Sequence, residues 1–288
     1  MGAYGCREGT LMRGAKRLLG LLVLCAAPAA AQPVSDAAIN EFVDSHSFVT
    51  RVDKIGRWED PICPAVEGLP ANFVKFITKR VRDVAIQAGA PVNADENCKG
   101  NIDIVFTPKP QALLDNVRNK QPVLLGYFDS SSQADHMAMV TRPIQAWHAT
   151  QTVDLRGNIL FDSRNILLTS KSQNTTGSRL GNGLRTSFYH AIVVADLGKL
   201  ADFEMGTLAD HVAMLALAQP VTEDVCPGLP SVLDITNSSC RKDAPVKALT
   251  QADIGYLRGL YQTDPGTALR SQKDGIVFHI KEALAGKP

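Results

Sequence analysis

The sequence lacks three features that would place it in a broad functional class: an excess of one charge, a long apolar run and a common catalytic motif. Lys and Arg number 30 and Asp and Glu 29, so the formal net charge is +1. Nucleic-acid binding needs a concentrated basic surface, which this balance argues against. No run reaches the ~18 apolar residues of a membrane helix. CxxC, GxSxG and P-loop spacings are also absent. We therefore expect no nucleic-acid partner and no stable membrane anchor.

The first residues have the pattern of an export signal. Basic residues at positions 13, 16 and 17 precede the apolar run Leu18–Ala27, and Ala29–Ala31 forms a small-residue cleavage site. This order is typical of a secretory signal peptide covering residues 1–31, with a mature chain from Gln32. Met12 is an alternative start, because Met12–Ala31 alone is a complete signal. The pattern predicts a periplasmic or extracellular protein.

Without the signal, the chain is one moderately large, nearly neutral unit. Residues 1–31 hold four of the 30 basic residues and one of the 29 acidic ones, which leaves 26 and 28 and a formal charge of −2. The remaining length permits one large domain or two small ones. We expect residues 32–50 to form a peripheral helical lead-in and residues 51–288 a single domain.

Four of the six cysteines follow the predicted cleavage site: Cys63, Cys98, Cys226 and Cys240. An even number in an exported chain indicates disulfides. Of the three possible pairings, short-range closure favours Cys63–Cys98 and Cys226–Cys240. A zinc–thiolate site is the alternative, but the spacings do not match one. Cys25 suggests lipidation, although Leu24 stands where a lipobox needs a small residue.

Hydrophobic periodicity predicts a mixture of helices and strands without regular alternation, which favours an α+β fold. The expected helices are Ala71–Ala88, Gln111–Arg118, Met205–Gln219, Gln251–Tyr261 and Thr267–Ala285, the last with a break near Gly275. The expected strands are an interrupted one over Ile55–Val66, then Asn101–Thr107, Val123–Phe128, Ala191–Asp196 and a hairpin of Ile144–Asp154 with Asn158–Ser163. Ser170–Gly183 is expected to be a loop.

Several fragments, in order, resemble the catalytic domain of matrixin-like (metzincin) zinc proteases. They are RWEDPI at 57–62, the helix at 73–88 followed by NIDIVF at 101–106, AIVVAD at 191–196, LPSVLD at 229–234 and LTQADI at 249–254. The last is the closest match. The chain is also similar to a family of uncharacterised secreted bacterial proteins. The resemblance implies a zincin-like mixed sheet with helices packed on it.

The active-site helix of the resembled family departs from its pattern here. That helix reads HExxHxxGxxH, in which histidines bind zinc and the Glu polarises a water molecule. With His211 on the first His, Val212 replaces the Glu and Leu215 replaces the second His. Ala218 and Val221 occupy the later positions. We therefore expect no metal, no cofactor and no catalytic residues, and we place His211 at the helix surface or paired with Asp210.

A second group of residues has the chemistry of a ligand cleft: Arg142, Trp147, His148, Arg179, Arg185 and His190. Glycines between Arg179 and Arg185 suggest an anion cradle of backbone N–H groups and guanidinium groups. The alternatives are a solvated loop for the glycine segment and ordinary buried structure for the hairpin. A serine hydrolase using Ser187, His190 and Asp196 is a weaker possibility.

The sequence thus predicts an exported, non-catalytic, zincin-like protein that binds an envelope protein or a peptide through a former protease cleft. The alternative is a secreted hydrolase or metallopeptidase with a non-standard site. A structural partner in an envelope complex is a third hypothesis. His136, His148 and His190 are the first candidates for zinc ligands if the second hypothesis holds.

Overall fold

A computed structural model describes residues 34–161, 183–221, 226–237, 240 and 245–287, and Val34–Pro288 form one contact unit. The predicted signal peptide and Arg179 lie outside the described residues. No helix among the described residues has the length and apolar character needed to span a bilayer.

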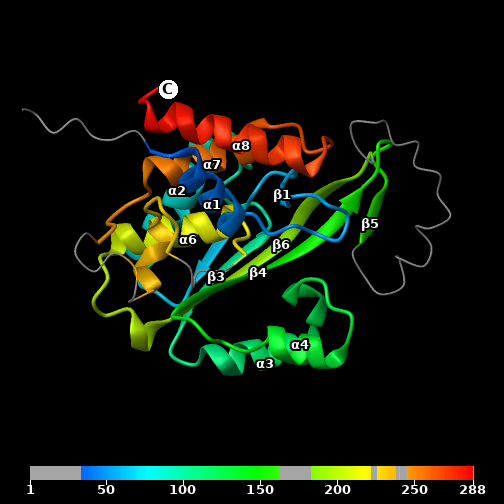
Figure 1. Cartoon of the computed structure of the whole chain (residues 1–288). Coiled ribbons are helices and arrows are strands. Elements are labelled where there is room, and N and C mark those ends of the chain that lie inside the picture. The colour runs from blue at the N-terminus through cyan, green and yellow to red at the C-terminus, as the bar shows by residue number, and fades with distance from the viewer. Residues whose placement is uncertain (1–33, 162–182, 222–225, 238–239, 241–244, 288) are drawn as a thin grey trace, which may run out of the picture. The chain divides into compact units, whose positions relative to one another are not determined.

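The centre of the unit is a mixed sheet of the order β2-β3-β6-β4-β5 (Figure 1). These strands are β2 (Pro64–Glu67), β3 (Ile102–Thr107), β6 (Arg185–Asp196), β4 (Ile144–Val153) and β5 (Ile159–Phe161). A short β1 (Arg57–Trp58) also pairs with β6. The β2–β3, β3–β6 and β1–β6 pairs are parallel, and β4 pairs antiparallel with β5 and β6. The predicted hairpin and the strand at 191–196 are confirmed, and β6 begins six residues earlier than expected.

One face of the sheet carries the main hydrophobic core. The helices that contribute side chains to this core are α1 (Asp36–His46), α2 (Ala71–Ala88), α6 (Met205–Leu217), α7 (Gln251–Gln262) and α8 (Leu269–Leu284). α2 forms because its apolar residues recur at helical spacing, and it ends at Gly89, whose φ of 84° is left-handed. The β2–α2–β3 segment joins two parallel strands, so part of the fold is a β–α–β unit. The mixture of helices and strands was predicted, but this unit was not.

The opposite face is covered by α3 (Pro110–Lys120), the 3₁₀ helix η1 (Pro122–Leu125) and α4 (Ser131–Met137), as Figure 1 shows. The prediction of a strand over Val123–Phe128 was wrong. Pro122 starts a 3₁₀ turn, and Leu125 is buried in a smaller core with Trp147 and Ile192. α4 was not predicted, because it is short and carries few apolar residues; the Ser130 side chain caps it.

The expectation of a peripheral lead-in was wrong. Ile39, Phe42 and Val43 of α1 are at most 2 % exposed and belong to the main core. The expected break near Gly275 was also wrong, since α8 is continuous through it. Gly275 lies against Thr263, so the glycine serves close packing and not helix termination.

Both predicted disulfides are confirmed. Cys63–Cys98 has a Cα separation of 6.0 Å and ties the start of β2 to the segment before β3. Cys226–Cys240 has a Cα separation of 5.4 Å. Each disulfide closes a loop and so lowers the entropy of the unfolded chain. In the chain-entropy model this stabilises the folded state by roughly 3–4 kcal/mol. Such pairs are compatible with a chain that folds in an oxidising compartment.

An ion pair joins α2 to α6. Arg80 Nε donates to Asp210 Oδ1, and Asp210 Oδ2 accepts the Leu249 N–H at 2.9 Å. The Asp210 side chain is 4 % exposed, whereas Arg80 is partly exposed. The arginine therefore neutralises a nearly buried carboxylate.

Replacing Arg80 by Ala should lower the free energy of unfolding by about 2–3 kcal/mol, because the Asp210 charge loses its partner while remaining buried. Urea unfolding would measure it. Lys79→Ala is the control: Lys79 pairs with Asp83 on the exposed side of the same helix, so its loss should cost under about 0.5 kcal/mol. Equal losses for the two variants would contradict the assignment.

Candidate functional site

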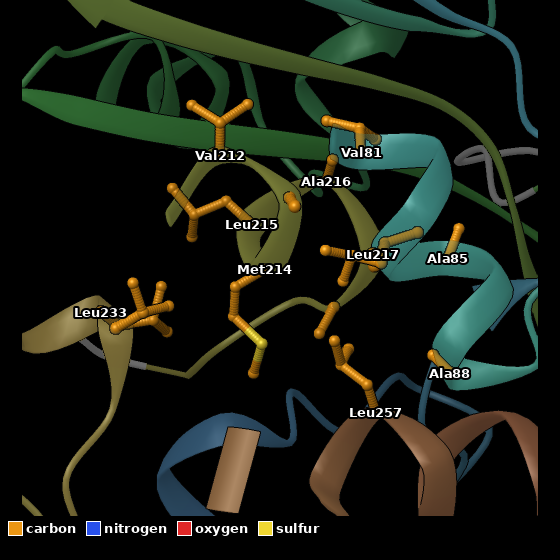
Figure 2. Close-up of a cluster of buried hydrophobic side chains, with 14 of the residues drawn as sticks. Val81, Ala85, Ala88, Val212, Met214, Leu215, Ala216, Leu217, Leu233 and Leu257 are labelled. Carbon is orange, nitrogen blue, oxygen red and sulfur yellow. The ribbon is translucent and has the colours of Figure 1, made fainter. Parts of the chain in front are cut away.

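The helix that was aligned with the active-site helix of the resembled family, α6, is buried along almost its whole length. Every residue from Thr207 to Leu217 is buried, and most are apolar. Figure 2 shows Met214, Leu215 and Leu217 of α6 in one cluster with Val81 and Ala85 of α2, Leu233 and Leu257. A helix that is apolar on all sides forms the centre of a core.

The predicted position of His211 was wrong. Its side chain is 0 % exposed, its Nδ1 donates to the Val232 carbonyl at 3.0 Å, and Asp210 pairs with Arg80 instead. Nε2 is buried, and it has no hydrogen-bond partner in the part of the chain that the structure describes. Burial lowers the pKa of His211 to about 4, with the Val232 contact opposing and the Arg142 charge adding to the decrease. The imidazole is therefore neutral at pH 7.

A zinc ion does not fit these residues. Val212 and Leu215 are 0 % and 1 % exposed, pack in the main core and offer no donor atom. The single imidazole nitrogen beside them is fewer than the three or four protein ligands that zinc takes. Within the described ranges, no cluster of three or more His, Cys, Asp or Glu side chains has the arrangement of a metal site.

The segment after α6 contributes a buried polar network that the sequence did not predict. Ser231, before the 3₁₀ helix η3 (Val232–Thr236), donates to Asp253 Oδ1 at 2.6 Å and contacts His46 Nε2 at 3.1 Å. Asp253 Oδ2 accepts the backbone N–H groups of Val232 and Thr250, both at 2.9 Å. The network fastens α1, η3 and α7 together.

This network has the side chains of a hydrolytic triad but not its order. Asp253 contacts Ser231 and not His46, and the serine is 0 % exposed, so no substrate reaches it. Burial lowers the pKa of His46 to about 4 and raises that of Asp253 to about 6, although the hydrogen bonds to Asp253 oppose that rise. This buried network therefore holds the three elements together and has no open site for a substrate.

The predicted ligand cleft is not assembled as one surface. Trp147 and His148 are 5 % and 2 % exposed, and they point to opposite faces of β4. Trp147 donates to the Met137 carbonyl at 2.7 Å in the smaller core. His148 lies against Phe188, with ring centroids 4.6 Å apart. Arg142 is half-buried near His211.

His148 is enclosed, and neither of its ring nitrogens has a hydrogen-bond partner among the described residues. Burial lowers its pKa to about 4, and the Leu215 carbonyl is near enough to oppose that change without meeting hydrogen-bond geometry. Neither Trp147 nor His148 can contact a ligand from solvent. That part of the cleft prediction was wrong, and the alternative of buried structure in the hairpin holds.

His190 and the residues of the hydrolase hypothesis are also apart. His190 Nε2 lies 3.0 Å from Asp103 Oδ2 on β3. Ser187 is buried and donates to the Phe188 carbonyl, and Asp196 accepts the Gly198 N–H. These contacts leave Ser187, His190 and Asp196 without the mutual hydrogen bonds of a triad.

Arg185, in contrast, lines a pocket of about 790 Å³, which we call the arginine pocket. Its walls come from β1, the start of β6, the turn after α2, the β4–β5 turn and the α7–α8 connection. The lining residues are Arg57, Trp58, Glu59, Gly89, Pro91, Leu155, Gly183, Leu184, Arg185, Tyr261, Asp264, Pro265, Gly266 and Thr267.

Two cations, the partly buried Arg57 and the buried Lys54, hold the walls of the arginine pocket in place. Arg57 Nη1 donates to the carbonyls of Leu260 and Thr263 at 2.8 and 2.6 Å, at the C-terminal end of α7. Lys54 Nζ donates to the carbonyls of Gly266 and Thr267. A cation suits the position of Arg57 because the carbonyls at the C-terminal end of α7 carry partial negative charge. The α7–α8 connection therefore has a fixed geometry.

The charged side chains of the arginine pocket balance one another. Arg185 Nε pairs with Glu59 Oε2 at 2.7 Å, and Asp264 Oδ1 accepts the Gly266 N–H at 2.8 Å. Burial lowers the pKa of Arg57, the nearby acids oppose this, and the Arg185 charge adds to the decrease. Arginine nevertheless stays charged in proteins. The pocket thus contains two positively charged side chains close together.

Comparison with known proteins gives no assignment. No family model, curated protein or solved structure matches the chain. The site must therefore be interpreted from its own chemistry.

Sequence reasoning identified Arg185 but missed its partners. Arg57 and Glu59 stand in the RWED segment, which was interpreted as part of a strand and as a fragment of the family resemblance but not as part of a site. The spacing of two charged residues around Trp58 was the available signal, since alternation places both on the face opposite the tryptophan. Asp264 and Gly266 lie in a DPG turn whose contact with β1 no local pattern indicates.

Proposed function

We propose that the chain is an exported, non-catalytic binding protein of zincin-like type. The observation that carries the proposal is the burial of Val212 and Leu215, which occupy the positions of the base and a zinc ligand in the resembled family. Neither side chain can ionise or bind a metal, and solvent reaches neither. Loss of chemistry leaves shape and hydrogen-bonding groups available for a ligand.

The ligand site in this proposal is the arginine pocket, in place of the former protease cleft. The positions of that cleft are filled by core side chains, whereas the arginine pocket is open and has a rigid frame. Its volume is within the range of ordinary ligand sites. A peptide or an envelope protein that inserts a side chain or chain end is the expected partner.

Purified protein beginning at Gln32 should not cleave unfolded protein substrates, and a chelator should leave its melting temperature unchanged. The reason is that no metal-linked stability exists to be removed. Calorimetry with and without chelator, alongside a casein cleavage assay, would test this. Chelator-sensitive cleavage, or a melting temperature lowered by several degrees, would support the metallopeptidase alternative instead.

A further inference from the structure

We propose that the arginine pocket binds the carboxylate of an organic ligand that has an apolar body. The inference rests on the proposed binding role and deepens it by naming the group that is recognised. Arg57 and Arg185 hold the carboxylate, and the proline and leucine side chains of the walls contact the rest of the ligand.

The two guanidinium groups are placed together by strand pairing. Arg57 of β1 is in register with Ser187 of β6, and Arg185 precedes Ser187 by two residues. Residues two apart on a strand share a face, so Arg57 and Arg185 extend from the same side of the sheet. Both line the same pocket.

Each arginine is fixed by one part of its guanidinium group. Arg57 uses Nη1 for two carbonyls, and Arg185 uses Nε for Glu59. A guanidinium has five N–H donors, so donors remain on both groups beyond these contacts. Fixed donors bind a planar carboxylate with a smaller loss of side-chain entropy than mobile ones.

The acids of the pocket are already engaged. Glu59 is paired with Arg185, and Asp264 accepts a backbone N–H within its own turn. An arriving carboxylate would therefore compete with Glu59 for Arg185 and would relieve the repulsion between Arg185 and Arg57. This competition gives the proposal a specific consequence: removing the Glu59 charge should strengthen binding.

The pocket is larger than an inorganic anion requires. It measures about 790 Å³, and Pro91, Leu155 and Pro265 provide apolar wall. Leu155 is 66 % exposed, so covering it with a ligand would remove apolar surface from water. An apolar body attached to the carboxylate uses this surface. A peptide C-terminus and a free fatty acid share that chemistry.

The test is titration calorimetry on the protein beginning at Gln32 with three probes: acetyl-Leu-Leu-Phe with a free carboxylate, the same peptide as its C-terminal amide, and octanoate. The peptide acid, octanoate or both should bind, and the amide should bind at least tenfold more weakly than the acid. Binding of the peptide acid alone identifies a peptide end, and binding of octanoate alone identifies a free acid.

Three variants make the test specific. Arg185→Gln should weaken binding at least tenfold, whereas Glu59→Gln should tighten it several-fold by freeing Arg185. Arg118→Gln is the matched control, because Arg118 Nε pairs with Asp135 at 2.7 Å on the other side of the sheet. It should leave the affinity unchanged. If Arg185→Gln fails to fold, the affinity of Glu59→Gln for the acids decides whether the proposal stands.

Three results would overturn the proposal: no binding of either acid, measurable binding of the peptide acid and the amide with equal affinity, or weaker binding by Glu59→Gln. The last would show that the Arg185–Glu59 pair only maintains the pocket's shape. These failures are separate from failure of the binding role, which metal-dependent cleavage would overturn. A protein that neither cleaves nor binds acids would lose only the carboxylate assignment.

Discussion

Acidification from pH 7 to pH 4 should destabilise the protein by roughly 5 kcal/mol or more. The cause is three buried histidines, His46, His148 and His211, whose pKa values burial lowers to about 4. In the unfolded chain each titrates near 6.5. Because the unfolded state then binds more protons than the folded state, stability falls as pH decreases from about 6.5 to 4.

The size of the effect follows from linkage. Each histidine contributes about 3 kcal/mol over this range, since one pKa unit corresponds to about 1.4 kcal/mol. Asp253 acts in the opposite direction. Burial raises its pKa to about 6, so its contribution favours the folded state as pH falls from 6 toward 4. One opposing group against three leaves a net loss comparable to the whole stability of many domains.

Urea unfolding at pH 7.5, 6, 5 and 4.5 would measure this dependence. His148→Gln should reduce the slope of stability against pH by about one proton, whatever its effect on stability at neutral pH. His136→Gln is the control, because His136 is exposed on α4, and its slope should equal that of the parent protein. A flat profile from pH 7.5 to 4.5 would contradict the burial of these rings.

Gly259→Ala should lower the free energy of unfolding by about 2–4 kcal/mol. Gly255 and Gly259 form the face of α7 that contacts α8, and a Cβ on Gly259 would lie 2.5 Å from Ile276 Cα. Backbone atoms cannot move aside as a flexible side chain can. The two helices would have to separate, and Ile276 and Ile280 would lose their packing.

The matched control is Gly206→Ala in α6. A Cβ there meets no atom within 4 Å, and the residue is exposed. The substitution should be neutral or stabilise by up to about 1 kcal/mol, because alanine loses less backbone entropy in a helix than glycine. Thermal unfolding of both variants would compare them, and a Gly259→Ala protein as stable as its parent would show that α7 and α8 are not in close contact.

Local patterns predicted most elements of the fold because neighbouring residues alone specify each of these elements. The periodicity of α2, the alternation of β3 and the cap at Thr250 each specify a short segment. The errors occurred where tertiary contacts decide. Leu125 is apolar in a short run that fits a strand or a turn, and its burial against Trp147 selects the turn. α1 is buried through α7 and η3, which are far away in sequence.

The site was predictable only in part, for the same reason. That Val212 and Leu215 offer no base and no zinc ligand is evident from the sequence without any structure. The depth of His211 was not predictable, because η3 supplies the carbonyl that its Nδ1 contacts. The arginine pocket joins residues from Arg57 to Thr267, and no spacing in the sequence shows that these segments meet.

The zinc content of the purified protein beginning at Gln32 tests most directly whether α6 carries a zinc centre. Elemental analysis after dialysis should give well under one zinc per chain, and His211→Ala should leave that value unchanged, since Val212 and Leu215 supply no ligands. One zinc per chain, lost on replacement of His211, would contradict the account.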